Sequence, residues 1–523
     1  MVIYLANFFR NIKNIFTQTF SSDDYNTNKS TLIHKISIDI NKIEKSINDT
    51  LNNSSDLVVK KTTFKNKELL VCYLDTLIDE KKVDESIIKP INTNKNSNIT
   101  TDKDIITFLS EDIINISVFN LLDDFNKSID LILEGYALLF IDGYSRCIAL
   151  ESKGYKGRNI EEPKSEAVIK GPREGFTENI NTNLGLLRRK IKSSKLNLES
   201  YSIGNETKTK IVITYMKGLA SNTILSQLRK KLNSIDIDGI LESNYIEELI
   251  EDNKYSLFPT IGHTEKPDIV AAKLLEGRFA IFCDGTPFVL TLPYLFVEAL
   301  QSGDDYYTRY YFSSYIRIIR IAAFIVTLTL PGIYVALTCF NIKSIPIELL
   351  LSIKNASEGI PFSPFFEALF MIVIFEFLRE AAIRMPRTLG QAVSIVGALV
   401  LGDAAAKAGF VSNSMLIITA LTAITSFIVP NFNQSVALIR IAILIAANIF
   451  GLLGVFVSIV ILVVHITSLK SVDVPFMYPF APLDVSGLKD TILRVPFWKM
   501  SKRPKFLINE NEDIIRFKNG MNK

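Results

Sequence analysis

The sequence contains few of the residues from which catalytic and metal sites are usually built. Among its 523 residues are only four cysteines, three histidines and one tryptophan. The cysteines, at positions 72, 147, 283 and 339, stand far apart and form no CxxC pair, so the sequence predicts neither a disulfide framework nor a zinc site. No HExxH, GxxxxGKS/T, GxGxxG or GxSxG run occurs, and such runs mark many familiar enzymes. We therefore expect a protein that is not an enzyme, with no catalytic residues, no metal and no cofactor.

An excess of charge of one sign is also lacking. Fifty-eight basic residues against fifty-five acidic ones give a formal net charge of +3, which is too balanced for the positive footprint of a nucleic-acid-binding protein. A secretory signal pattern is missing too, because residues 1–20 have no basic stretch before their apolar residues and no small-residue cleavage site. We therefore expect no nucleic-acid partner, and a cytoplasmic location for whatever precedes the first membrane span.

Apolar residues, by contrast, are abundant and unevenly distributed. They make up 48% of the chain, the mean hydropathy is +0.23, and they concentrate beyond residue 317. Residues 1–120 are rich in Asn, Lys, Ser, Thr and Asp and predict a polar lead-in that is partly disordered or helical. Its first turns, residues 5–16, carry one apolar face that docks on the protein's own domain, lies on a membrane surface or packs on a partner.

Two similar hairpins are predicted in the middle of the chain. Residues 136–150 read YALLFIDGYSRCIAL, two apolar strands joined by Asp142-Gly143, which is the strongest short hairpin signal. Residues 276–292 match residues 134–150 at Glu, Gly, Phe, Asp and Gly with one constant offset. This match indicates an internal duplication, although two unrelated hairpins with Asp-Gly turns would also look alike.

The segments between these hairpins indicate a mixed α/β fold. Residues 209–216, TKIVITYM, alternate like a strand, and residues 221–232 place their apolar side chains on one helical face. We therefore expect a cytoplasmic α/β N-terminal domain of two small subdomains, residues 121–220 and 221–303.

Beyond this domain the chain predicts an α-helical polytopic membrane domain, residues 304–470, with about five or six transmembrane helices. Its apolar segments approach the roughly 20 residues that cross a hydrocarbon core of about 30 Å, and they are 318–340, 364–383, 389–408, 414–429 and 435–469. The last would form a helix of about 50 Å, so we expect a break at the glycines of FGLLG, Gly451 to Gly454. Basic residues before the first segment, after the second and in the tail suit six crossings. Residues 471–523 are expected to form a cytoplasmic basic C-terminal tail.

Charged residues inside these apolar segments are candidates for an ion pathway, because an unpaired charge in hydrocarbon costs at least about 2.5–3.5 kcal/mol. Spacings of four residues would alternatively let neighbouring charges neutralise one another near a membrane surface. The candidates are Glu367, Glu376, Arg379, Glu380, Asp403 and Lys407.

A ladder of small residues in the third apolar segment predicts close helix packing, either within one subunit or between subunits around a pore. Its members are Gly390, Ser394, Ala398, Gly402 and Ala406.

Long ordered runs between residues 135 and 497 resemble the A subunits of spore germinant receptors, the GerA family of endospore-forming bacteria. They include GPREGFTENINTNLGLLRRKI at 171–191, EELIEDNKYSLFP at 247–259, TEKPDIVAAKLLEGRFAIFCDGTPFVLTLP at 264–293, QSGDDYYTRYY at 301–311, and PFSPFFEALFMIVIFEFLREAAIRMPRTLGQAVSIVGALVLGDAAAKAGFVS at 361–412.

The resemblance implies a multi-pass protein of the inner membrane of the spore, with its N-terminal domain facing the cytoplasm or spore core. It implies partnership with a transporter-like B subunit and a lipoprotein C subunit, contact with membrane lipid, and assembly into a homo-oligomer. The function it implies is nutrient sensing that triggers spore germination, through a ligand-gated cation-conducting oligomer. A non-conducting scaffold subunit and a secondary transporter stay open as alternatives.

The matching runs also carry positions over from the family. The implied membrane-core positions are Pro361, Glu367, Glu376, Arg379, Glu380, Pro386, Gly390, Gly402 and Asp403. Their counterparts in the soluble domain are Pro172, Asn183, Asp284 and Arg309.

Overall fold

The computed structural model describes residues 35–93, 105–109, 113–114, 119–154, 162–163, 166, 168, 170–385, 402–500 and 503–508, except positions 66 and 486. The predicted apolar face at 5–16 lies outside the described residues, as do most of the third apolar segment and Pro386, Gly390, Ser394 and Ala398.

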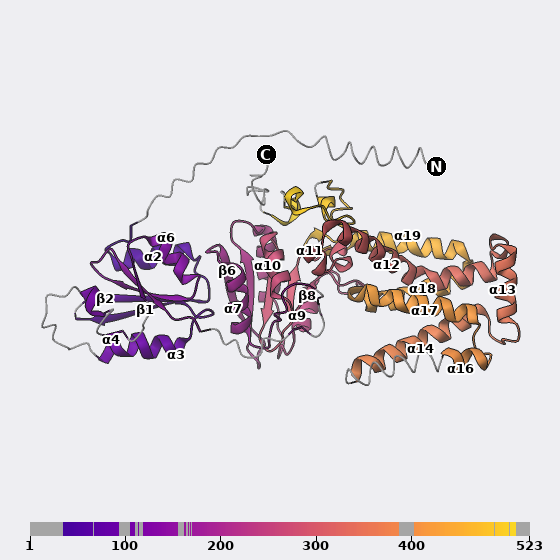
Figure 1. Cartoon of the computed structure of the whole chain (residues 1–523), viewed down its shortest axis with the longest axis horizontal. Helices are drawn as coiled ribbons and strands as arrows, with labels where there is room; N and C mark the ends of the chain where they lie inside the picture. The colour runs from indigo at the N-terminus through magenta and orange to yellow at the C-terminus, as the bar shows by residue number, and fades with distance from the viewer. Residues whose placement is uncertain are drawn as a thin grey trace.

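The first subdomain is a five-stranded antiparallel sheet with helices on both faces (Figure 1). The strands are β1 (Leu57–Phe64), β2 (Lys67–Leu74), β3 (Phe119–Leu122), β4 (Tyr136–Ile141) and β5 (Cys147–Glu151), in the order β1-β2-β4-β5-β3. One face is covered by α2 (Ile40–Thr50) and α6 (Phe125–Ile132), and the other by the short helical turns α3 (Glu80–Val83), η1 (Asp84–Ile88), α4 (Lys89–Thr93) and α5 (Ile105–Phe108). Alternate residues of β2 enter these two cores, as the period of two in a strand requires.

The second subdomain repeats this plan. Its strands are β6 (Leu196–Ile203), β7 (Thr209–Met216), β8 (Gly262–Thr264), β9 (Phe279–Cys283) and β10 (Val289–Leu292), in the order β6-β7-β9-β10-β8. The helices α7 (Ile180–Lys190) and α10 (Pro267–Leu275) cover one face, and α8 (Asn222–Asn233) and α9 (Ser243–Ile250) cover the other. The second sheet therefore has the same topology as the first.

Both predicted hairpins are confirmed, and in each turn the aspartate accepts a hydrogen bond from the first residue of a helix. Asp142 Oδ1 accepts a hydrogen bond from the backbone N–H of Ile40, the first residue of α2, at 3.4 Å. Asp284 Oδ1 accepts one from Ile180, the first residue of α7, at 3.1 Å. The glycine after each aspartate has a positive φ, +84° and +92°, which favours glycine. The shared device and the shared strand order support the internal duplication.

Strand pairing differs from the expected subdomain boundaries in two places. Residues 40–74, which fall in the predicted lead-in, supply α2, β1 and β2 of the first sheet. Residues 180–216, placed with the first subdomain, supply α7, β6 and β7 of the second sheet. The physical reason is that both sheets are completed by pairing between strands far apart in the sequence. Local composition does not indicate which distant strands will pair.

The helical domain consists of long antiparallel helices that run between the end beside the α/β domain and a far end (Figure 1). They are α12 (Tyr310–Cys339), α14 (Pro364–Arg384), α17 (Asn413–Ile428), α18 (Asn433–Phe450) and α19 (Leu452–Ser468), with α13 (Ile347–Ser357) and α16 (Gly402–Lys407) at the far end. The predicted break is confirmed at Gly451, where φ is +62° and an added Cβ would lie 3.0 Å from Phe340 Cβ.

Two stretches in the described part of the chain are long and apolar enough to cross a membrane, Tyr310–Cys339 and Pro430–Phe450. The helices α17 and α19 are apolar but shorter. The expected total of five or six spans stays a prediction.

The remaining short elements lie in the connections between these helices and strands and in the chain beyond α19. They are η3 (Phe296–Leu300), α11 (Asp304–Tyr307), η4 (Ile342–Ser344), η6 (Pro430–Phe432), β11 (Lys470–Ser471), β12 (Val474–Pro475), η7 (Gly487–Lys489), η8 (Phe497–Lys499) and η9 (Lys505–Leu507). After α19 the chain returns to the second subdomain, where Val472, Val474, Tyr478 and Leu507 are part of the core. The segment expected as a basic C-terminal tail, residues 471–523, therefore begins with packed residues.

Candidate functional site in the helical domain and at its junction

The central polar feature of the helical domain is an ion pair between α14 and α18. Arg440 is only 2% exposed, and its Nη2 donates to Glu376 Oε1 at 2.7 Å. The other carboxylate oxygen of Glu376 lies 2.5 Å from Nη2 of Arg379, one helical turn along α14. Sequence reasoning found Glu376 and Arg379 but missed Arg440. The signal available was a lone arginine inside the apolar run SVALIRIAILI.

Glu367 contacts the start of a neighbouring helix. Its carboxylate is buried and accepts a hydrogen bond from the backbone N–H of Ser412 at 2.7 Å. Ser412 is the N-cap residue of α17, and its own hydroxyl accepts from Met415 at 3.2 Å. A carboxylate at a helix N-terminus is stabilised by the helix dipole, so Glu367 ties the start of α14 to the start of α17.

The other predicted charges form two exposed pairs. Arg384 Nη2 lies 2.6 Å from Glu380 Oε1 at the end of α14, and Lys407 Nζ lies 2.6 Å from Asp403 Oδ2 in α16. All four side chains are more than half exposed. The six predicted residues are thus distributed over separate contacts rather than gathered in one site.

The described part of the small-residue ladder packs within the chain. Gly402 is buried, and a Cβ added there would lie 3.1 Å from a methyl group of Leu416 in α17. Ala406 is half-buried.

At the junction of the two domains lies a second buried ion-pair network, which we call the junction cluster: Asp305, Tyr306, Arg317, Arg320 and Asp490. Arg317 of α12 is 1% exposed; its Nε donates to Asp305 Oδ2 at 3.0 Å and its Nη1 to Asp490 Oδ1 at 2.8 Å. Arg320 holds both oxygens of Asp305 at 2.9 Å, the strong two-pronged arrangement of arginine and carboxylate. The sequence indicated these arginines only as cytoplasmic flanking charges.

The pKa values of the two carboxylates of the junction cluster are shifted in opposite directions. Burial by itself would raise the pKa of Asp305, but Arg320 and Arg317 outweigh it and hold that pKa below its ordinary value. Burial dominates at Asp490 and raises its pKa, although Arg317 and Tyr306 oppose the shift. The Tyr306 hydroxyl donates to Asp490 Oδ2 at 2.6 Å.

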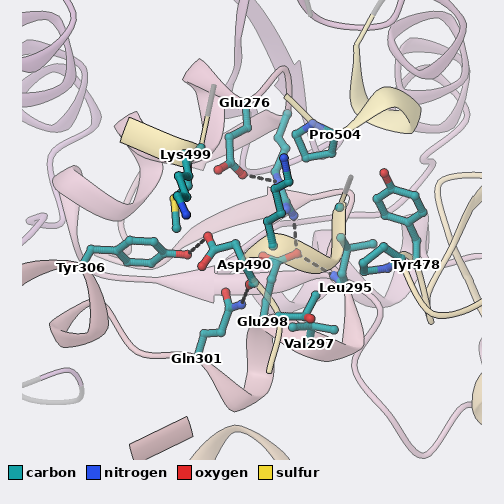
Figure 2. Close-up of a pocket in the computed structure, with 16 residues that line it drawn as sticks. Glu276, Leu295, Val297, Glu298, Gln301, Tyr306, Tyr478, Asp490, Lys499 and Pro504 are labelled. Carbon is teal, nitrogen blue, oxygen red and sulfur yellow. Dashed lines mark hydrogen bonds and ion pairs between the residues drawn. The ribbon is translucent and has the colours of Figure 1, made fainter. Parts of the chain in front are cut away.

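A cavity of about 100 Å³ borders this network (Figure 2). Its walls come from the second subdomain, η3, α11 and the chain beyond α19. Arg278 lies between two carboxylates here: its Nε is 3.4 Å from Glu276 Oε2, and its Nη1 donates to Glu298. The cavity is therefore bounded by the second subdomain, the short elements before α12 and the C-terminal chain.

A third buried pair joins the two α/β subdomains. Arg188 of α7 donates through Nε and Nη2 to both oxygens of Asp56, each at 2.9 Å, and both side chains are buried. Ser54 also accepts from Arg188, at 2.8 Å. Because an unpaired buried charge is costly, this contact fixes the subdomains against one another.

Three of the four family positions expected outside the membrane domain contact helix starts. Asn183 and Asp284 both hold the beginning of α7: Asn183 bonds the backbone N–H and carbonyl of Thr177 at 2.7 and 2.6 Å. Arg309 is the N-cap residue of α12. Pro172 lies in the chain just before Thr177. Within the described residues, no three His, Cys, Asp or Glu side chains are grouped so that they could hold a metal ion.

Comparison with known proteins places this architecture in a family. The model of the Bacillus/Clostridium GerA spore germination protein family matches residues 45–506. Spore germination protein KA of Bacillus subtilis is 42% identical over 464 residues, covering 88% of this chain and 85% of the relative. The uncharacterized membrane protein YfkQ of the same organism is 41% identical, covering 86% and 88%. The crystal structure of the N-terminal domain of the A subunit of the Bacillus megaterium spore germinant receptor GerK3 is 34% identical, covering 51% and 98%, with a TM-score of 0.41. The chain therefore belongs to the Bacillus/Clostridium GerA spore germination protein family.

Proposed function

We propose that this chain is the A subunit of a nutrient germinant receptor and forms a ligand-gated cation-conducting oligomer in the inner spore membrane. Its partners would be a transporter-like B subunit and a lipoprotein C subunit. Membership of the spore germination family supports the receptor role. The conducting role is our inference from the helical domain.

The observation that carries the conducting role is the exposure of two ion pairs on the α14 and α16 side of the helical domain. Glu380 with Arg384 and Asp403 with Lys407 are more than half exposed, although Phe377 on α14 is exposed as well. Charges that face hydrocarbon cost at least about 2.5–3.5 kcal/mol each. This side of the domain exposes charged pairs together with apolar side chains, among them Phe366, Phe370 and Ile383, and in our proposal it faces neighbouring subunits.

The two pairs also mark the two ends of a path. Glu380 and Arg384 close α14 at the end beside the α/β domain, whereas α16 lies at the far end (Figure 1). Copies of the chain that bring these helices together around an axis would surround a channel with charged mouths. Cation preference would then depend on the carboxylates, since rings of acidic side chains select cations.

Gating requires that a ligand bind one state of the assembly more tightly than another. The junction cluster supplies a mechanical route, because Arg317 and Arg320 attach α12 to Asp305 and Asp490. A movement of the second subdomain would be transmitted to α12 through these bonds.

The test is nutrient-triggered cation flux from liposomes that contain the chain with its B and C partners. Asp403→Asn with Lys407→Gln, and Glu380→Gln with Arg384→Gln, should change the cation selectivity and lower the flux. The matched control is Glu348→Gln with Lys354→Gln on α13, two exposed charges outside the proposed path, which should leave the flux unchanged.

Correct assembly and nutrient binding without flux would instead favour the non-conducting scaffold. Flux of a nutrient coupled stoichiometrically to a cation would favour the secondary transporter. Equal effects of the α13 control and the α14 and α16 variants would refute the proposed path.

Orientation can be tested with a native cysteine. Cys339 is exposed at the far end of α12, whereas Cys72, Cys147 and Cys283 are buried. If the α/β domain faces the cytoplasm or spore core, a membrane-impermeant maleimide should label Cys339 only from the opposite side. Labelling from the side of the α/β domain would contradict this orientation.

A further inference from the structure

The chain beyond α19 exposes a group of large apolar side chains that the proposed function does not use. We call Ile492, Leu493, Phe497 and Trp498 the C-terminal aromatic patch. All four are exposed, and Trp498 is 59% exposed. Clusters of this kind on a protein surface usually mark a contact with a partner or a membrane.

The C-terminal aromatic patch is fixed beside the beginning of α12. The backbone N–H of Arg494 donates to Ser314 Oγ at 3.0 Å, and Ser314 Oγ donates to the carbonyl of Arg494 at 3.2 Å. The Trp498 ring lies 6.1 Å from the ring of Tyr310, the first residue of α12. The patch is therefore continuous with one of the two helices that are long and apolar enough to span a membrane.

The beginning of α12 extends the same surface. Tyr310, Tyr311 and Tyr315 are exposed on its first two turns. Tyrosine and tryptophan are enriched where membrane proteins meet the headgroup layer, because their rings combine an apolar body with a polar edge.

The charge of the segment complements an anionic membrane surface. Between residues 489 and 505 the sequence has six basic residues and one acidic residue, Asp490. Of the basic residues, Arg494 is buried and donates to the carbonyl of Thr308, so it adds no charge to the surface. Asp490 points into the junction cluster, where Arg317 and Tyr306 bond it. Lys499 follows Trp498 directly and is exposed. Apolar rings beside lysines are the composition of segments that lie in the plane of an anionic bilayer.

We propose that the C-terminal aromatic patch is an interfacial membrane anchor, which inserts into the headgroup layer of an anionic bilayer beside α12. It would hold the C-terminal chain, and with it Asp490 of the junction cluster, at a fixed height above the bilayer. The proposal goes beyond receptor function and does not depend on ion conduction. It requires only that α12 crosses the membrane.

The chain offers a direct reporter, because Trp498 is its only tryptophan. The full-length protein would be reconstituted into vesicles of equal parts phosphatidylcholine and phosphatidylglycerol, with or without bromine on the acyl chains near the headgroup. We expect brominated lipid to quench most of the Trp498 emission, and aqueous iodide to quench it weakly. In vesicles of phosphatidylcholine alone, or with Lys499→Gln, we expect the inserted population to fall roughly fivefold for each lost charge contact.

Two control variants in a Trp498→Phe background calibrate the quenchers. Leu121→Trp places the reporter at an exposed position on β3, where iodide should quench and brominated lipid should not. Phe427→Trp places it at an exposed position near the end of α17, where brominated lipid should quench. Phe497→Trp in the same background reports on the patch a second time, so that the test does not depend on one variant.

Three results are possible for Trp498. Quenching by brominated lipid supports the anchor. Quenching by iodide alone overturns the proposal, because the patch then faces water. Protection from both quenchers also overturns it, because the patch is then covered by another subunit or a second copy of the chain.

Discussion

Replacing Glu376 with glutamine tests whether the ion pair inside the helical domain is a requirement of the fold. The substitution leaves Arg440 buried, with its anionic partner removed; in the described residues Glu376 is the carboxylate that contacts it. Removing one partner of a buried pair costs about 3–5 kcal/mol, because the remaining charge is desolvated without compensation. We expect Glu376→Gln to destabilise the helical domain by that amount.

Replacing Arg440 should destabilise the domain less than replacing Glu376, and this difference follows from the geometry of the pair. Arg440→Met removes the deeply buried charge, while Glu376 keeps Arg379 at 2.5 Å. We expect a cost below about 1 kcal/mol, because replacing a buried ion with an apolar side chain of similar volume is often neutral. The double variant should recover most of the stability lost by Glu376→Gln, which corresponds to a coupling energy of about 2–3 kcal/mol.

The measurement is unfolding of the purified full-length protein in mixed micelles with increasing SDS, followed by circular dichroism. Equal losses of unfolding free energy for Glu376→Gln and Arg440→Met would refute the reasoning, because they would show that Arg379 does not stabilise the charge of Glu376. A cost below about 1 kcal/mol for Glu376→Gln would show that Arg440 is solvated.

Three further predictions concern other parts of the chain. Asp56→Asn should lower the stability by about 3–5 kcal/mol and weaken the contact between the two α/β subdomains, because it leaves Arg188 buried without its anionic partner. Limited proteolysis should then cut between the subdomains. Substitution of the more exposed Glu44–Lys61 pair should not increase this cleavage. Gly451→Ala should destabilise the α18–α19 hairpin by more than about 2 kcal/mol, because the added Cβ meets Phe340. Gly409 has φ +72° and no atom within 4 Å of an added Cβ, so Gly409→Ala should lower the stability only by the strain of a left-handed alanine, about 1–2 kcal/mol. Equal SDS midpoints for the two variants would contradict the role of Phe340. Burial, reinforced by Glu251, Glu242 and Glu248, raises the pKa of Glu247 to about 8. The folded protein therefore binds this proton more tightly than the unfolded chain, so stability should fall as the pH rises from about 4.5 to 8. Glu247→Gln should abolish this contribution in thermal unfolding, whereas Glu248→Gln, which removes only one of the three reinforcing charges, should weaken it only in part.

Several elements could be predicted because their signals are local. The Asp-Gly turns at Asp142 and Asp284 specify hairpins by the backbone angles that glycine allows, and FGLLG specifies the break between α18 and α19. Strand β7 lies at Thr209–Met216, where the alternation of apolar residues predicts it. Family membership was also contained in the sequence, as long ordered runs that resemble the GerA family.

The candidate site was predicted only in part, because charge partners are chosen by packing. Spacing along one helix predicted the pair of Asp403 and Lys407, which four residues place on one face. No spacing could indicate that Arg440 would meet Glu376 across 64 positions, or that Arg317 would meet Asp490 across 173.

By itself, then, the sequence determined the periodic and local features of this protein: the apolar helices, the two hairpins, the helix break and the family. The tertiary structure alone decided that residues 40–74 complete the first sheet, and that the chain after α19 returns to the second subdomain and the beginning of α12. The physical reason is that burial of a charge or a strand edge depends on which distant segment covers it. That choice is made by the packing of the whole chain rather than by any residue and its neighbours.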